Sequence, residues 1–298
     1  MRKWVPLYAA VLLLLAGSQV SAAAGTSPAI PQELKSKLEI HVQSWIEMLS
    51  AQPQFQTWKK AAPVIVPIGP GQHGWLVSLS VDRKPVGYMI VNALENGGFS
   101  LGEYGVGSHP AFDPNTLYQS LVRQGLFDTY SDALKKPLKL ERLYVHPLLA
   151  VWKWSAPDGQ IRYLDAWSGE ALPINNELWE RQLTKQSFGP TQSTSGEEET
   201  KLSSSHLNKA FDPYERMPWL TKSPLTHTQL SRLPELLDSK AEIRFTAELY
   251  DGTVLFVWPT IGYHRWNNQT DYVAFEQDQG GTRFVPFNTI SGGGRFYR

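Results

Sequence analysis

Cysteine is absent from all 298 residues of the sequence. The chain therefore has no disulfides, no thiolate nucleophile and no zinc site built on sulfur. An excess of either charge is also absent, since 28 Lys and Arg residues balance 28 Asp and Glu residues. Nucleic-acid binding requires a basic stripe that displaces counterions from phosphates, and anionic lipid attracts a comparable basic segment. The composition argues against both functions.

Long hydrophobic runs are missing, apart from one short run near the N-terminus. Residues 5–16 are apolar except for Pro6, follow Arg2 and Lys3, and precede small residues. A membrane-spanning helix needs about 20 apolar residues, whereas a positive start, a short apolar core and a small-residue exit are typical of a secretory signal. We therefore expect residues 1–24 to be a signal peptide, with an uncleaved N-terminal anchor as the alternative.

Cleavage after Ala22 or Ala24 would release a nearly neutral mature protein. The signal removes Arg2, Lys3 and no acidic residue, which leaves 26 basic against 28 acidic residues. We expect this protein to be secreted or located at the cell surface, without an integral membrane segment after signal removal. Lacking disulfides, it depends on an apolar core for its stability. Nothing in the sequence implies a cofactor, so we expect none.

Residues 187–208 differ in composition from the rest of the chain. They are rich in Ser, Thr, Gly and Glu, and Leu202 and Leu207 are their only aliphatic residues. Such a stretch cannot bury enough apolar surface to offset its ordering entropy. The sequence thus predicts a flexible linker between an N-terminal α+β region, residues 26–186, and a C-terminal α+β domain, residues 209–298.

Helix and strand patterns alternate along the chain. Apolar residues spaced three and four apart predict a helix over 31–51, and shorter helices are expected at 115–124 and 226–237. Each is followed by runs typical of strands, at 75–81, 86–92 and 99–104; at 140–145, 149–155 and 161–165; and at 241–250, 254–261, 271–276 and 283–287. Short turns favour antiparallel pairing. We expect an α+β fold of repeated units, each a helix packed on an antiparallel strand meander, in two globular parts.

Two short stretches resemble modules of exported bacterial proteins. Residues 58–61 (WKKA) and 84–91 (KPVGYMIV) resemble the prosegment-like modules that precede secreted cysteine peptidases of the streptopain and staphopain sort. Residues 161–172 (IRYLDAWSGEAL) resemble the last strand and turn of a PepSY-type module. The resemblance concerns the N-terminal part only. It implies a non-catalytic module that binds, inhibits or helps to fold an exported partner.

Asp165 and Glu170, on either side of Gly169 in the second stretch, also have a plain structural explanation. An Asp side chain can close a turn onto the backbone two residues further on, and glycine tolerates positive φ. We therefore expect these residues to form a turn rather than a reactive site.

Residues 262–268 (GYHRWNN) are the densest group of polar and aromatic residues, and they are expected to form a loop between two strands, with Asp271, Glu276 and Asp278 following. Loops at strand ends collect binding residues, and His264 could act as a general base near pH 7. The alternative is an ordinary hairpin loop with a half-buried aromatic residue and solvated neighbours. The candidate binding residues are Tyr263, His264, Arg265, Trp266, Asp271 and Glu276.

Catalytic motifs are lacking elsewhere in the sequence. The carboxylates of Asp271 and Glu276 would face opposite sides of a strand, and a turn at Asp278 disturbs the pair Glu276–Asp278. No Gly-x-Ser-x-Gly motif occurs, and the seven histidines form no His-x-x-x-His pair. We therefore expect no catalytic or metal-binding residues.

The sequence favours an exported, non-catalytic protein that binds an extracytoplasmic protein or peptide. An extracytoplasmic hydrolase or carbohydrate-binding protein acting on cell-wall material is the alternative, and a structural protein that assembles through its sheets is a third. Residues 292–298 are expected to form the last strand of a sheet, or otherwise an exposed peptide for a partner.

Overall fold

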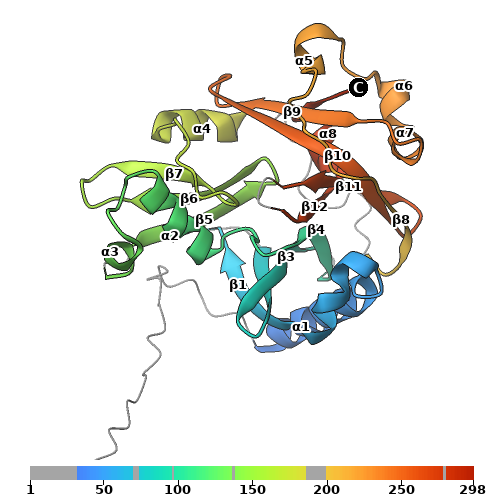
Figure 1. Ribbon diagram of the computed structural model, residues 1–298. Coiled ribbons are helices and arrows are strands. Elements are labelled where there is room, and N and C mark those ends of the chain that lie inside the picture. The colour runs from blue at the N-terminus through green and yellow to red at the C-terminus, as the bar shows by residue number, and fades with distance from the viewer. Residues whose placement is uncertain (1–31, 70–73, 96, 136–137, 186–198, 278–279) are drawn as a thin grey trace, which may run out of the picture.

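A ten-stranded antiparallel sheet and a three-stranded antiparallel sheet organise the computed structural model (Figure 1). The structure describes residues 32–298 apart from 70–73, 96, 136–137, 186–198 and 278–279. Helices accompany both sheets, which confirms the expected α+β class. The expected signal peptide, residues 1–24, lies outside the described residues. In the part of the chain that is described, no helix is both long enough and apolar enough to cross a membrane.

The first part of the chain forms a helical layer and one half of the large sheet. Its elements are α1 (Gln32–Leu49), the 3₁₀ helix η1 (Pro53–Lys60), β1 (Ala62–Ile68), β2 (Gly74–Val81), β3 (Lys84–Ala93) and β4 (Phe99–Val106). Within α1, Leu38, Val42 and Trp45 are buried because their spacing places them on one face. The helix and the last three strands match the sequence prediction, whereas η1 and β1 are not among the expected elements.

The middle of the chain forms the three-stranded sheet and the helices beside it. Its elements are α2 (Pro114–Arg123), α3 (Tyr130–Lys135), β5 (Lys139–His146), β6 (Leu149–Ser155), β7 (Ile161–Asp165) and α4 (Asn176–Thr184). Asp113 caps the N-terminus of α2, because its carboxylate accepts a hydrogen bond from the Thr116 N–H at 2.9 Å. Pro114 follows at the first helical position, where the missing N–H costs nothing.

The last part of the chain completes the large sheet. Its elements are β8 (Leu202–Leu207), α5 (Pro218–Thr221), α6 (His227–Leu230), α7 (Leu233–Asp238), β9 (Ile243–Leu249), β10 (Val254–Trp266), β11 (Thr270–Glu276), β12 (Thr282–Pro286), α8 (Phe287–Ser291) and β13 (Arg295–Tyr297). Strand β13 pairs with β9 at the end of the sheet. The C-terminal residues thus form the last strand, as the first of the two sequence-based alternatives predicted.

Strands from distant parts of the sequence meet inside the large sheet. Strand β4 pairs with β12, with Tyr104 opposite Phe284, so the strand order is β1-β2-β3-β4-β12-β11-β10-β9-β13 (Figure 1). The N-terminal region expected at 26–186 and the C-terminal domain expected at 209–298 therefore share one sheet instead of forming separate ones.

The segment expected to be a flexible linker, residues 187–208, is ordered at its C-terminal end. Residues 202–207 form β8 and pair with β10. Glu199 is 2% exposed, and its carboxylate accepts hydrogen bonds from the Tyr272 hydroxyl at 2.8 Å and the Leu101 N–H at 3.0 Å. The prediction of a flexible linker is wrong here, because strand pairing and a buried carboxylate hold this polar stretch in place. Residues 186–198 lie outside the described residues.

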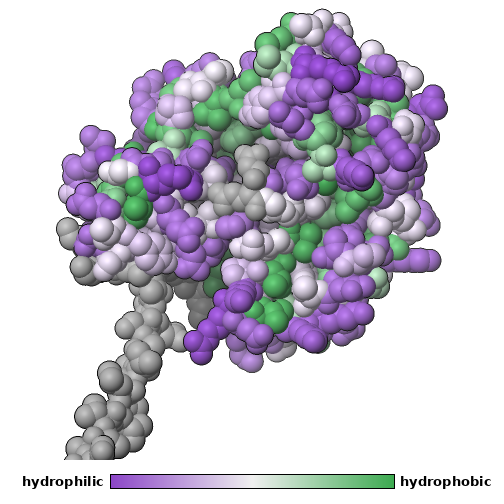
Figure 2. Space-filling model, in the orientation of Figure 1, coloured by the Kyte–Doolittle hydropathy of each residue, from purple (hydrophilic) through white to green (hydrophobic). Residues whose placement is uncertain are grey.

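The large sheet is covered on both faces. One face packs against α1 and η1 in a cluster that contains Trp45, Trp58 and Trp266. The other face packs against α7, α4 and part of the three-stranded sheet, in a cluster that contains Phe245 and Tyr263. On the surface, in the same orientation, hydrophilic residues divide the hydrophobic ones into separate patches (Figure 2).

Strand β10 changes partners at a bulge. Its first half pairs with β9, its second half pairs with β11 and β8, and the register shifts between Thr260 and Gly262. The bulge reverses the alternation of side chains, so that Phe256 and Trp258 before it share a face with Tyr263 after it. Residues 262–266, which the sequence analysis placed in a loop, are strand because β8 and β11 pair with them on both edges.

Gly262 is a sensitive point of this arrangement. A Cβ atom there would lie 2.0 Å from the carbonyl oxygen of His206 and 2.8 Å from Cδ2 of Leu207. We expect Gly262→Ala to push β8 away from β10 and to lower the free energy of unfolding by about 1–3 kcal/mol, the usual cost of overpacking. Urea unfolding measures the loss, and hydrogen exchange of the β8 amides locates it.

Ser204→Ala is the matched control, because the Ser204 side chain on β8 is exposed. It should change neither the free energy of unfolding nor the protection of β8. If the β8 amides of Gly262→Ala stayed as protected as those of the wild type, the packing argument would be wrong.

Candidate functional site

The six residues that the sequence analysis grouped together do not form one site. Four of them, Tyr263 to Trp266, are consecutive on β10, so their side chains alternate between the two faces of the sheet. Asp271 and Glu276 lie near opposite ends of β11. The structure divides the group among the core, the opposite sheet face and a cleft.

His264 and Trp266 belong to the core, and both are 0% exposed. The Tyr104 hydroxyl lies 2.8 Å from Nδ1 of His264 and accepts a hydrogen bond from Nε1 of Trp266 at 3.0 Å. The Gln54 side-chain amide lies 3.2 Å from Nε2 of His264. Burial lowers the pKa of His264 to about 3, so its ring is neutral at pH 7. A ring enclosed in this way cannot serve a substrate as a general base.

Tyr263, Arg265 and Asp271 lie on the opposite face of the hairpin. Nε and Nη2 of Arg265 donate to the two carboxylate oxygens of Asp271 at 2.7 and 2.9 Å. The Tyr263 hydroxyl donates to Asp238 at 3.2 Å. A cavity of about 190 Å³ adjoins Tyr263 and Asp271. Because these polar groups bind one another, they stabilise the hairpin and its contact with α7.

Glu276 lies apart from the other five, on a cleft of about 410 Å³. We call this the β7–β10 cleft, since it separates the turn after β7 from strands β10 and β11. The turn contributes Asp165, Trp167, Ser168, Glu170, Ala171, Leu172 and Pro173; the strands contribute Val254, Phe256, Trp258, Phe275 and Glu276; and His109, Gln277 and Arg283 complete the lining. Four of these residues are Trp or Phe, and three are acidic.

Arg283 is the most deeply buried charged residue of the cleft, with a side chain that is 4% exposed. Its Nε and Nη2 atoms donate to the carboxylate of Glu103 at 3.1 and 2.8 Å. Its guanidinium carbon lies 3.5 Å from the ring centre of Trp167 and 4.8 Å from that of Trp258. Burial disfavours the charge, but the Glu103 carboxylate outweighs it and raises the pKa of Arg283. The cleft therefore contains a cation that a buried carboxylate already neutralises.

Glu103 also connects the cleft to the core. Its carboxylate accepts hydrogen bonds from the hydroxyls of Tyr88 and Tyr144, the latter at 2.8 Å. The Tyr88 oxygen accepts a further hydrogen bond from Nε1 of Trp167 at 3.1 Å. Burial and the Glu103 carboxylate raise the pKa of both tyrosines, which keeps them protonated as donors. Trp167 is thus fixed through Tyr88 to the buried ion pair.

The turn that carries Trp167 is held by its own first residue. The Oδ1 atom of Asp165 accepts hydrogen bonds from the N–H groups of Trp167 at 2.9 Å and Ser168 at 2.7 Å. Gly169 follows with φ of 68°, a conformation that glycine adopts without steric cost. The structural role that the sequence analysis assigned to Asp165 and Gly169 is confirmed.

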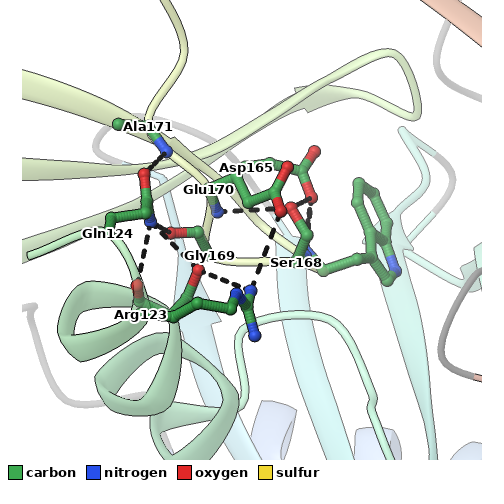
Figure 3. A network of polar contacts seen from close by, with 9 residues as sticks. Arg123, Gln124, Asp165, Ser168, Gly169, Glu170 and Ala171 are labelled. Atoms are coloured by element: carbon green, nitrogen blue, oxygen red, sulfur yellow. Dashed lines mark hydrogen bonds and ion pairs between the residues drawn. The ribbon is translucent and has the colours of Figure 1, made fainter.

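Gln124, next to the end of α2, holds the same turn from outside (Figure 3). Its amide nitrogen donates to the carbonyl oxygen of Gly169 at 3.1 Å, and its amide oxygen accepts from the Ala171 N–H at 2.8 Å. Arg123 lies 3.7 Å from the carboxylate of Glu170. One wall of the cleft is therefore rigidly anchored to the middle part of the chain.

Several polar groups of the cleft are engaged with the protein itself. The Asp165 carboxylate is used within its own turn, and Nδ1 of His109 lies 3.2 Å from Oγ1 of Thr116. Within the described ranges, no three His, Asp or Glu residues are arranged to hold a metal ion. Burial raises the pKa of Glu276, and none of the described residues makes a hydrogen bond or ion pair with its carboxylate.

Trp167, Trp258 and Arg283 are functional candidates that the sequence analysis missed. Trp167 had a local signal, because it lies within the stretch 161–172 and directly after an Asp that closes a turn. Trp258 and Arg283 had none, since each lies inside an ordinary strand pattern and reaches the cleft only through the packing of β10 and β12.

No protein-family model matches the chain, and no curated protein sequence is significantly similar to it. The function must therefore be argued from the geometry of the cleft.

The buried ion pair provides a test of how the cleft is held. Removing one partner leaves the other charge buried and unpaired, which typically costs about 3–5 kcal/mol. We expect Arg283→Met to lower the free energy of unfolding by about this amount, measured by urea denaturation. Arg232→Met is the control, because Arg232 and Glu235 form an exposed ion pair that should contribute little. If both variants lost a similar amount of unfolding free energy, the role assigned to Arg283 would be wrong.

His264 should make the stability of the protein sensitive to acid. Its pKa is about 3 in the folded protein and about 6.5 in the unfolded chain, so between these values only the unfolded chain binds the proton. The free energy of unfolding should then fall by about 1.4 kcal/mol for each pH unit below 6.5 through this group. His264→Gln should reduce the slope of the free energy of unfolding against pH by the contribution of one proton. His227→Gln, at an exposed position, should leave this slope unchanged. Urea denaturation between pH 4 and pH 7 measures both slopes, and parallel profiles would refute the assignment.

Proposed function

We propose that this is an exported, non-catalytic protein that binds a segment of an extracytoplasmic protein or peptide in the β7–β10 cleft. The observation that carries the proposal is the cleft itself, a concave site of about 410 Å³ whose lining includes Trp167, Phe256, Trp258 and Phe275. Ligand sites are typically concave and apolar with a few polar groups. Aromatic residues in such sites contribute much of the binding energy because they bury large areas at low entropic cost.

The rigidity of the walls supports a binding role. Hydrogen bonds to Asp165 and Gln124 hold the turn, and a hydrogen bond to Tyr88 holds the Trp167 indole. A site that is ordered before the ligand arrives loses less entropy on binding. The turn wall thus needs little rearrangement to receive a partner.

The sequence resemblance supports the same region of the molecule. Residues 161–172, which resemble the closing strand and turn of a PepSY-type module, supply β7 and the turn that forms one wall of the cleft. The resemblance implies that this module binds, inhibits or helps to fold an exported partner. The N-terminal pattern of residues 1–24 supports export, and the recurrence of helices before strand meanders supports a chain of repeated units.

Carbohydrate binding is the second candidate. The indole rings of Trp167 and Trp258 line the cleft and could stack on the apolar face of a sugar. Hydrolysis requires two carboxylates roughly 5–9 Å apart across the scissile bond. Of the pairs considered from the sequence, Asp271 is bound by Arg265 and Asp278 lies outside the described residues.

Phe256 and Leu255 allow a matched test of the cleft. Phe256 lines the cleft, whereas its neighbour Leu255 is 44% exposed and is not part of the lining. We expect Phe256→Ala to weaken binding to a synthetic peptide array at least about tenfold, since it removes a buried aromatic contact. Leu255→Ala should bind like the wild type.

Both variants should have the circular dichroism spectrum of the wild type, which separates a lost contact from a lost fold. Binding to the array that is equal in Phe256→Ala and Leu255→Ala would exclude the cleft as the peptide site. Binding to insoluble wall polysaccharide but to no peptide would favour the second candidate.

A further inference from the structure

Arg283 uses only part of its hydrogen-bonding capacity within the protein. All three nitrogens of a guanidinium group are donors. Nε and Nη2 of Arg283 donate to Glu103 at 3.1 and 2.8 Å, and Nη2 also donates to the carbonyl oxygen of Pro147. Among the described residues, no group accepts a hydrogen bond from Nη1. One corner of the guanidinium is therefore left for a ligand.

This corner is reachable from the β7–β10 cleft, although the Arg283 side chain is only 4% exposed. In the part of the chain that is described, the polar side-chain atoms that are both enclosed and unpaired are Ser100 Oγ, Arg142 Nε, Trp154 Nε1 and Thr260 Oγ1. Nη1 of Arg283 is not one of them, so an unpaired Nη1 must be open to solvent. The edge between Nε and Nη2 faces Glu103, which is 0% exposed, and Nη1 lies at the opposite corner, towards the cleft.

The guanidinium is fixed between the two walls of the cleft. Its central carbon lies 3.5 Å from the ring centre of Trp167 on the turn and 4.8 Å from that of Trp258 on β10. The paired hydrogen bonds to Glu103 give this planar group a single orientation. A donor that is ordered before the ligand arrives costs little entropy on binding. Nη1 is thus a preformed donor next to aromatic surface.

The charges of the lining favour an uncharged acceptor. Glu103 cancels the charge of Arg283, and the charged residues that the turn contributes, Asp165 and Glu170, are both acidic. A carboxylate entering the cleft would lose hydration without gaining a net positive partner. A carbonyl oxygen carries no charge and is satisfied by one donor. Every peptide bond has such an oxygen, and apolar side chains beside it can pack on aromatic rings.

We propose that Nη1 of Arg283 donates a hydrogen bond to a backbone carbonyl oxygen of a peptide bound in the β7–β10 cleft. The apolar side chains next to that carbonyl pack against Trp167 and Trp258. This inference rests on the proposed function, because it names the contact by which the same cleft holds its ligand. It assigns an uncharged, apolar peptide segment as the ligand class and Arg283 as the residue that positions its backbone.

The ligand side of this hydrogen bond can be changed without altering the protein. The probe is the best-binding peptide from the synthetic array, with its backbone carbonyl oxygens replaced by sulfur one at a time, because sulfur is a weak acceptor. We expect one position to weaken binding to the wild type about tenfold, the effect of losing a hydrogen bond to a charged donor. The other positions should bind like the unmodified peptide in isothermal titration calorimetry.

Arg283→Lys and Arg232→Lys are the matched variants. Arg283→Lys keeps a charge beside Glu103 but has no second nitrogen to direct into the cleft. Arg232 is exposed and lies outside the lining. The loss at the sensitive position should persist in Arg232→Lys and disappear in Arg283→Lys.

A measurement on the wild type covers the case in which Arg283→Lys lacks the circular dichroism spectrum of the folded protein. In NMR spectra of wild-type protein isotope-labelled at arginine, the guanidinium signal of Arg283 should shift when the unmodified peptide is added. The peptide with sulfur at the sensitive position should shift it less. An Arg283 signal that neither peptide changes would contradict the contact.

Wild-type binding that is insensitive to sulfur at every position, or equal sensitivity in Arg283→Lys and Arg232→Lys, would overturn this inference and leave the cleft as a peptide site. Selection of peptides for an acidic residue or a free terminal carboxylate would also overturn it, because the acceptor would then be charged. A wild-type protein that binds no peptide, or a Phe256→Ala variant that binds as well as the wild type, would instead overturn the proposed function on which the inference rests.

Discussion

The buried ion pair between Glu103 and Arg283 is the interaction on which both the large sheet and the cleft depend. It joins β4 to β12, where strands from distant parts of the sequence meet. Burying two charges costs several kcal/mol per ion unless hydrogen bonds satisfy them. Here Tyr88 and Tyr144 donate to Glu103, and Tyr88 in turn holds Trp167. The contact that joins the two parts of the sheet therefore also positions one wall of the cleft.

A second polar network shows how different a buried site can be from a binding site. His264 and Trp266 both form hydrogen bonds with the Tyr104 hydroxyl inside the core, and all three side chains are fully enclosed. The hydrogen bonds offset the free-energy cost of burying these polar atoms. Because the atoms are enclosed, a ligand cannot reach them. The β7–β10 cleft, in contrast, has Trp167, Phe256 and Trp258 in its lining. Aromatic side chains that line a cleft form a surface that a ligand can bury.

Much of the secondary structure was predictable because local patterns reflect local physics. The buried stripe of α1 and the Asp165 turn appear where the sequence indicated them. Strand β1 was missed because Pro63 and Pro67 disfavour a strand, although an edge strand tolerates them. Strand β8 was missed because its polar composition resembles a linker, whereas its order comes from pairing with β10, more than 50 residues away in sequence.

The functional residues were less predictable, because proximity in sequence does not give proximity in space. The sequence by itself determined the α+β class, the absence of thiol chemistry and the turn after β7, all of which depend on composition or on neighbouring residues. Only the tertiary structure decided that Trp258 lines the cleft while His264 is enclosed. The reason is that the strand pairing and the bulge at Thr260–Gly262 select the face on which each side chain of β10 lies. Both the pairing and the bulge depend on contacts with residues that are distant in sequence.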